Sequence, residues 1–279
     1  MSDKKRVLIV TQEMEPYAAL SEIAAIARKL PQYAQDKGGM EVRVLMPRYG
    51  TINERRHRLH EVVRLSGMNI IVDDDDYPLI IKVASLPGAR MQVYFLDNDD
   101  FFKRKSVFED AEGKPFADNA ERMVFFCKGV IETVKKFGWP PDFIHCHGWM
   151  TALLPLYLRE AYRNEPLFER SKIIYSCYDN SLEATFSDAF LTKAAINNLE
   201  RENLAAYHDG DKITLQHGAI HHADAVIRGT EEMSEETEAL LVASEKPVLD
   251  FQSPEEYLPN YLAFYDSLVE VEEEESVEG

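Results

Sequence analysis

The sequence predicts one α/β domain built on a doubly wound, Rossmann-like parallel sheet. Apolar runs of strand length alternate with amphipathic helical patterns along the 279 residues. The chain opens strand–helix–strand, which implies a parallel pair joined by a right-handed crossover. Neither an internal repeat nor a linker-like segment interrupts this alternation. We therefore expect residues 1–269 to form a single domain and the acidic run "EVEEEESVEG" at 270–279 to be a disordered tail.

The first third of the chain predicts the opening unit and a β-hairpin extension. A buried strand at 6–11 precedes a helix at 17–38, bent at Pro31 and stopped by two glycines, and a second strand at 41–47 follows. Hairpin-linked strands at a sheet edge are expected at 60–72, 78–86 and 92–97. The four aspartates at 73–76 indicate a solvated turn. A cation loop is the lesser alternative, because its ligand spacing and glycine are missing.

The remaining elements continue the α/β alternation. The strongest helix is expected at 116–138, capped by Asp118 or Asn119 and ended by Gly138. Strands are expected at 142–147, 172–178, 223–229 and 246–251, and helices at 149–164, 234–243 and 254–270, with a polar, helical or irregular segment at 180–222. Ligands of such sheets bind beyond the carboxyl ends of the strands, so we expect the site there.

Composition excludes several classes of function. The net charge of −18 opposes binding to nucleic acid and to anionic lipid surfaces. No signal peptide or membrane-spanning run is apparent. The three cysteines, Cys127, Cys146 and Cys177, form no CxxC pair. These features predict a reduced, cytoplasmic protein without disulfides.

The cluster His145-Cys146-His147 allows three interpretations: a metal site, a nucleophile with its base, or the end of a buried strand. In a strand, the two histidines share one face and Cys146 takes the other. That geometry separates the thiol from both imidazoles, which opposes a nucleophile–base pair. Two histidines alone are too few ligands for zinc. The strand-end interpretation is favoured.

Other chemical motifs are weak or missing. His217 and His221 have helical i, i+4 spacing, but their only evident third ligand would be Asp224, so we expect no metal there. The first strand-to-helix turn contains no glycine. Neither a dinucleotide fingerprint nor a Walker loop occurs, and we expect no bound cofactor.

An ordered set of segments resembles the N-terminal catalytic domain of bacterial glycogen synthases and plant starch synthases. These segments are "VLIVTQEMEPY", "VRVLMPRYG", "VYFLDNDDFFKR", "ADNAERMVFFCKGVIE", "PDFIHCHGWMTALLPLYL" and "HGAIHHADAVIRGT", between about residues 6 and 235. The resemblance implies one half of a GT-B glycosyltransferase that uses ADP-glucose. It also implies that the histidine cluster ends the strand before the sugar-binding cleft.

Matching positions supply candidate substrate-binding residues: Glu13, Asp118, Asn119, Arg122, His145, His147 and Trp149. For Asp118 and Asn119 a helix cap is the competing role, for Arg122 an ion pair, and for Trp149 the core. The catalytic pattern is altered. The family's phosphate-binding Lys-Thr-Gly-Gly-Leu falls at residues 19–23, so Ala19 replaces the lysine and Glu22 a glycine. Gly148 replaces an aspartate, and Tyr178-Asp179 replaces a His-Asn pair. We expect no catalytic residue to remain.

The resemblance implies a role in glycogen metabolism, and the altered positions predict no efficient glucosyl transfer by this chain alone. The family's second domain has no counterpart expected in these 279 residues. Two alternatives stay open: an active glucosyltransferase completed by a partner chain, and a non-catalytic regulatory or structural partner of a glycogen enzyme. The expected ligands are a glucan or an ADP-sugar, and the expected partners are a second copy or a glycogen enzyme.

Overall fold

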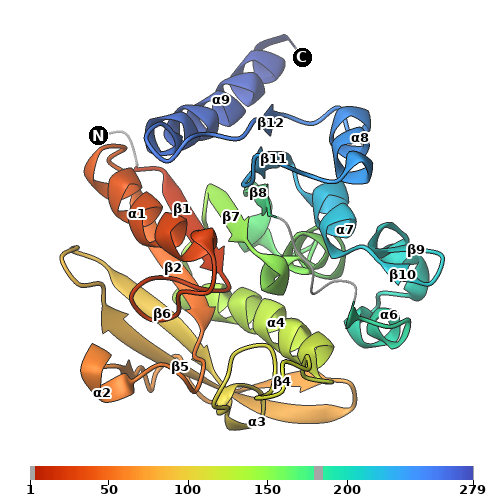
Figure 1. Ribbon diagram of the computed structural model, residues 1–279. Coiled ribbons are helices and arrows are strands. Elements are labelled where there is room, and N and C mark those ends of the chain that lie inside the picture. The colour runs from red at the N-terminus through yellow and green to blue at the C-terminus, as the bar shows by residue number, and fades with distance from the viewer. Residues whose placement is uncertain (1–3, 179–184, 279) are drawn as a thin grey trace.

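The computed structural model describes residues 4–178 and 185–278, and its centre is one large sheet (Figure 1). The strand order is β12-β11-β8-β7-β1-β2-β6-β5-β3, with β4 paired to β5. Every pairing from β12 to β6 is parallel, whereas β5 runs antiparallel to β6, β3 and β4. The predicted doubly wound sheet with a hairpin extension is therefore confirmed.

The strands of this sheet are β1 (Arg6–Thr11), β2 (Glu41–Pro47), β3 (His60–Glu61), β4 (Met68–Val72), β5 (Asp75–Ser85), β6 (Gln92–Asp97), β7 (Phe143–His147), β8 (Lys172–Cys177), β11 (Ala225–Arg228) and β12 (Val248–Leu249). A separate pair is formed by β9 (His208–Asp209) and β10 (Lys212–Ile213). The α-helices are α1 (Glu22–Asp36), α2 (Glu54–His57), α3 (Asp99–Phe102), α4 (Asn119–Phe137), α5 (Leu154–Leu156), α6 (Ala189–Ala194), α7 (Leu215–His222), α8 (Glu235–Ala243) and α9 (Tyr257–Glu278).

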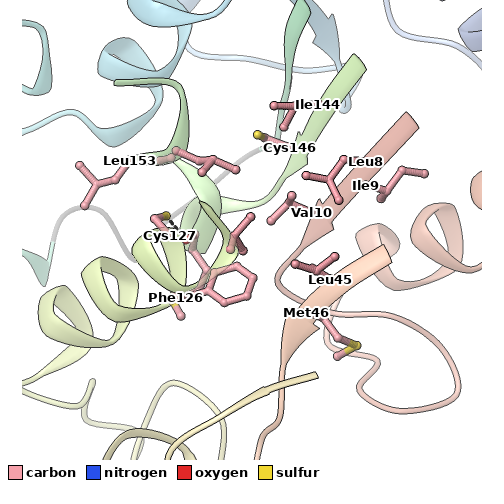
Figure 2. Close-up of a cluster of buried hydrophobic side chains, with 14 of the residues drawn as sticks. Leu8, Ile9, Val10, Leu45, Met46, Phe126, Cys127, Ile144, Cys146 and Leu153 are labelled. Carbon is pink, nitrogen blue, oxygen red and sulfur yellow. Dashed lines mark hydrogen bonds between the residues drawn. The ribbon is translucent and has the colours of Figure 1, made fainter. Parts of the chain in front are cut away.

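Helices cover both faces of the sheet, and β7 shows how the alternation works. Ile144 and Cys146 belong to the hydrophobic core that also contains Phe126 and Cys127 of α4, and Figure 2 shows this cluster. The odd-numbered residues of β7 point the other way, and the ring of Phe143 stacks on Tyr265 of α9 at a centroid distance of 5.1 Å. Helix α9 packs beside α1 on that second face. All five residues of β7 are buried.

Several predicted boundaries were wrong for local reasons. Helix α1 begins at Glu22, not at 17, because Ser21 takes the N-cap position and its hydroxyl accepts a bond from the Ile23 amide at 3.3 Å. The chain before it folds into a turn closed by a bridge between Met14 and Ala18. The helix predicted at 149–164 is instead a series of short helical turns around Pro155, which lacks an amide hydrogen to donate.

The last helix is longer than predicted. Helix α9 extends to Glu278, so its helical span includes most of the acidic run at 270–279, for which the sequence predicted a disordered tail. Near its middle, Asp266 forms an ion pair of 2.9 Å with Lys5, which joins the two ends of the described chain. Among the described residues, no helix combines the length and apolar character needed to cross a lipid bilayer.

Candidate functional site

The chain reverses its direction across the sheet between β1 and β7, and this switch point lies at the carboxyl edge. From β1 the chain adds β2 and β6 on one side, and from β7 it adds β8, β11 and β12 on the other. Crevices at such points are where open α/β sheets bind ligands. The residues that follow β1, β7, β8 and β11 therefore define the candidate site.

Glu13 lies at the end of β1 and is fully buried. Its Oε2 accepts hydrogen bonds from the backbone amides of Leu20 and Ser21 at 2.5 and 2.8 Å, and its Oε1 accepts one from the Ser21 hydroxyl at 2.8 Å. Amides at the start of a helix are the groups that bind phosphate in many α/β proteins. In this chain the carboxylate of Glu13 accepts hydrogen bonds from two of the amides that precede α1.

Gln12 fills the space between β1 and β7. Its Oε1 accepts a bond from the Met150 amide at 3.4 Å, and its Nε2 donates to Glu13 at 3.2 Å. The residue opposite is Gly148, where an added Cβ would meet the Gln12 side chain at 2.3 Å. Gly148 also has φ of 86° and ψ of 165°, a conformation that only glycine adopts readily. The glutamine and the glycine are therefore complementary.

A second large side chain, Tyr178, fills the next gap, after β8. A Cβ at Gly229 would lie 2.4 Å from the Tyr178 ring, so the ring takes the space that this glycine leaves. The Tyr178 hydroxyl contacts His147 Nδ1 at 2.9 Å. Burial raises the pKa of Tyr178 well above its ordinary value, so the phenol is neutral. The adjoining Asp179 lies outside the described residues.

His145 and His147 are side by side at the end of β7, with ring centroids 3.9 Å apart, and both are fully buried. His145 Nδ1 contacts the Tyr265 hydroxyl at 2.6 Å, and its Nε2 contacts the Ser176 hydroxyl at 2.7 Å. Burial lowers the pKa of His147 to about 3 and the pKa of His145 well below its usual range. Both imidazoles are thus neutral at pH 7.

The part of the crevice between Glu13 and the two histidines lacks positive charge. Of the side chains named there, none is cationic at pH 7, whereas Glu13 and Glu22 are acidic. Beside Tyr178 a hollow of about 380 Å³ stays open, and Lys212 lines it together with Glu232 and Glu236. Leu20, which is 51% exposed, and the neighbouring Glu22 form the surface of the loop before α1. The charge of Glu22 contributes, after burial and Tyr261, to the raised pKa of Tyr178, which places this carboxylate within electrostatic reach of the crevice. A diphosphate would meet negative charge on this side.

Three sequence-predicted residues at the start of α4 hold a neighbouring loop in place. Asp118 occupies the N-cap position but makes no capping bond, because it pairs with both terminal nitrogens of Arg104. Asn119 donates to the Phe108 carbonyl at 3.0 Å. Arg122 is fully buried and donates to the Phe101 carbonyl at 2.9 Å and to Asn119 Oδ1 at 2.7 Å. The ion pair of Asp118 is made with Arg104.

A hollow of about 300 Å³ lies beside this loop, between the starts of α4 and α6. The rings of Phe116, Phe186 and Phe190 line it together with Asn119 and two lysines. Trp149 packs against Phe186 at 5.7 Å, and its Nε1 has no hydrogen-bond partner among the described residues. Aromatic rings with a few polar groups are typical of small-molecule sites. Of the predicted candidates, Asn119 therefore forms part of the wall of this hollow, although it is only 3% exposed and its side-chain amide bonds to Phe108 and Arg122.

The two histidine clusters do not converge on a metal. His217 and His221 both lie on α7, where His217 approaches Thr237 at 3.4 Å and Glu236 at 3.9 Å. Asp224 bonds instead to Arg159 and to the Ile173 amide. Within residues 4–178 and 185–278, no three His, Cys, Asp or Glu side chains are arranged to hold a metal ion.

The fold and the site define a class first: one Rossmann-like half of a GT-B glycosyltransferase. A model of the starch synthase catalytic domain matches residues 6–240, and the chain belongs to this family. The glycogen synthase of Chlorobium limicola is 36% identical over 222 residues, which are 78% of this chain and 44% of that protein. The glycogen synthase of Pelodictyon phaeoclathratiforme is 33% identical over 234 residues, which are 83% of this chain and 47% of that protein. The chain thus spans about half the length of these relatives.

A solved structure gives the same fold. The catalytic domain of starch synthase IV from Arabidopsis thaliana, bound to ADP and acarbose, superposes with a TM-score of 0.74 over 90% of this chain and 52% of that chain, at 19% identity. The predicted family is confirmed.

Sequence reasoning missed the residues that close the crevice. Gln12 adjoins the predicted Glu13, but its partner Gly148 is remote in sequence, so neither residue alone reveals the pairing. Tyr265 was missed as the partner of His145, although a signal was present. Tyr257, Tyr261 and Tyr265 follow i, i+4 spacing on the last helix, which indicates one buried face.

Proposed function

We propose that this domain acts in glycogen metabolism as a non-catalytic relative of glycogen synthase that binds glucan weakly and does not transfer glucose from ADP-glucose by itself. The observation that carries the proposal is the self-filled crevice at the switch point. Gln12 and Tyr178 fill the space beside Gly148 and Gly229, and Glu13 accepts hydrogen bonds from the loop amides. The expected location in the cytoplasm belongs to the same proposal.

Electrostatics supports the loss of transfer. When glucose leaves ADP-glucose, negative charge develops on the departing diphosphate, and positioned positive groups are usually the largest catalytic contribution. The crevice offers two neutral histidines, a neutral tyrosine and two carboxylates in their place. An unpaired carboxylate near a phosphate opposes binding by on the order of a few kcal/mol in a half-buried site.

The hollow beside α4 supports glucan binding. Sugar rings present apolar faces and hydroxyl edges, and the hollow offers the half-buried rings of Phe116 and Phe186 beside the exposed polar residues Lys114 and Ser187. It is separate from the filled crevice, so a glucan can bind there without a nucleotide. Binding of a protein partner or a second copy at the same edge is the alternative outcome of the experiment.

The test is incorporation of radiolabelled glucose into glycogen by the purified chain, with a genuine glycogen synthase as positive control. We expect no incorporation above background, and calorimetry should detect a maltooligosaccharide but neither ADP nor ADP-glucose. The variant Phe186→Ala should lose the oligosaccharide heat, whereas Phe251→Ala, at a partly exposed ring outside the hollow, should keep it. Incorporation close to that of the control would show a working enzyme.

A loop variant separates the causes of the loss. Ala19→Lys with Glu22→Gly restores the cation and removes one repelling charge, and leaves the Ser21 cap intact. We expect measurable ADP binding only when Gln12→Ser and Tyr178→His are added, because the volume must also be cleared. Strong ADP binding by the loop variant alone would contradict the role given to the filled crevice.

A further inference from the structure

A second hollow lies at the opposite edge of the sheet, where β2 and β6 begin. It has a volume of about 550 Å³, within the range of small-molecule sites. Its walls come from the first residues of both strands and from the segments that lead into them. Since parallel strands all begin at this edge, a ligand bound there is separated from the switch point by the length of the sheet.

Arg43 is the fixed cation of this hollow. Its guanidinium lies over the rings of Phe137 and Trp139, at 4.5 and 4.6 Å from their centroids, and its side chain is 25% exposed. Burial lowers its pKa, the direction expected for a charge whose lost hydration is only partly replaced. The aromatic rings fix the plane of the guanidinium, and its nearest carboxylate oxygen, on Glu41, is 3.8 Å away.

Glu41 offsets this charge only in part, because Arg6 shares the same carboxylate. Its Oε1 accepts a hydrogen bond from Trp139 Nε1 at 2.7 Å. Its Oε2 lies 3.7 Å from Arg6 Nε, so Arg6 shares the same carboxylate. Among the described residues that line the hollow, Glu41 is the one that is acidic.

Two further cations line the hollow without a carboxylate partner. Within the described part of the chain, no acidic oxygen lies within ion-pairing distance of Lys4 or Arg90. Gln35, Gln92 and Tyr94 add polar groups to the same wall. With Glu41 shared with Arg6, the hollow keeps an excess of positive charge in a protein whose net charge is −18. Such a local excess favours an anionic ligand.

We propose that this hollow, bounded by Lys4, Arg43 and Arg90, binds the phosphate group of a small phosphorylated metabolite. A guanidinium held in a fixed plane offers paired donors that match phosphate oxygens, and lysine adds a mobile point charge. The polar residues Gln35, Gln92 and Tyr94 face the remainder of the metabolite. The proposal does not depend on the proposed function, because the two sites lie at opposite edges of the sheet.

The test is calorimetric titration of the purified chain at low ionic strength with inorganic phosphate, with a sugar phosphomonoester such as glucose 1-phosphate, and with glucose. We expect phosphate to bind with a Kd of about 1 mM or tighter and the phosphomonoester more tightly, and glucose not to bind at this site. Equal affinity for the two anions would assign the site to free phosphate. The absence of binding by either anion up to about 10 mM would overturn the proposal.

Charge-matched variants decide the location. Arg90→Gln and Lys4→Gln should each weaken phosphate binding about fivefold or more, because each removes an unpaired cation next to the anion. Arg55→Gln removes the same charge from an exposed position on α2, outside the hollow, and should change the affinity less than twofold. Arg43→Gln should abolish phosphate binding. If that variant does not fold, the variants of the exposed residues Lys4 and Arg90 decide the outcome. Equal weakening by Arg55→Gln would reduce the effect to net charge and overturn the assignment.

Discussion

The switch point and the amino edge of the central sheet are built in opposite ways. At the switch point, large side chains fill the gaps that glycines leave, the imidazoles are neutral, and the exposed loop is acidic. Hollows stay open farther along the same edge, at the start of α4 and beside Tyr178. At the amino edge, a hollow stays open and cations exceed carboxylates. The topology alone would assign the ligand to the carboxyl edge. The difference teaches that side-chain volume and charge, and not strand order, decide which edge can receive an anion.

The largest expected effect tests the neutrality of the carboxyl edge by pH. His145 and His147 have folded-state pKa values lowered by burial, so the unfolded chain binds more protons below about pH 6.5 and stability falls as pH falls. Between pH 6 and 4, protonation of His147 should reduce the free energy of unfolding by roughly 2.5 kcal/mol, and His145 acts in the same direction. Above pH 7, neither histidine should contribute to the pH dependence of stability.

Urea unfolding at several pH values measures this effect. Carboxylates also contribute to acid unfolding, so His147→Gln is the matched variant. Between pH 6 and 4, its free energy of unfolding should fall less than that of the unchanged chain, and the difference is the contribution of His147. Identical slopes for the two proteins would mean that His147 is already protonated in the folded state.

The second prediction tests the complementarity of Gln12 and Gly148. Gly148→Ala should cost about 3 kcal/mol, since the new Cβ collides with Gln12 and the backbone conformation is unfavourable for alanine. When Gln12→Ala is added to Gly148→Ala, the double variant should regain only the part of the lost free energy of unfolding that is due to the collision. Gly39→Ala, at a glycine with positive φ and open space around it, shows the effect of a strained backbone without a collision. If the two alanine variants are equally stable, the packing argument fails.

The smallest effect is expected at the amino edge. Arg43→Met retains most of the packing against Phe137 and Trp139 and removes a charge that has no hydrogen-bonded carboxylate. Replacing an under-compensated, partly buried charge with an apolar side chain is often neutral, so we expect a change within about 1 kcal/mol. A loss of several kcal/mol would show that Arg43 serves the fold and not a ligand.

The elements of the fold were predictable because each one has a recognisable pattern in its own stretch of sequence. The apolar runs of β1, β2, β7 and β8 have strand length, and Gly138 ends α4 with positive φ as expected. The start of α1 was placed too early, because the segment before Ser21 has helical composition but its turn is fixed by contacts with Glu13.

The side-chain packing at the candidate site was harder to predict from the sequence. Sequence resemblance located Glu13, His145 and Trp149 at the carboxyl edge, yet it could not show that Gln12 occupies the space beside Gly148. Packing between residues distant in sequence is not recorded in any local pattern. The hollow around Arg43 was not predicted for the same reason, because its three cations come from three separate segments of the chain.

The covering of β7 by α9 has a consequence for synthesis on the ribosome. His145 and its partner Tyr265 are 120 residues apart in the sequence, and Lys5 and Asp266 are 261 residues apart. At about 5–20 residues per second, roughly 6–24 s separate the emergence of β7 from that of the helix that shields it. Throughout this interval one apolar face of the nascent sheet is open to water, and the newborn chain is then a natural client for chaperones that bind such surfaces.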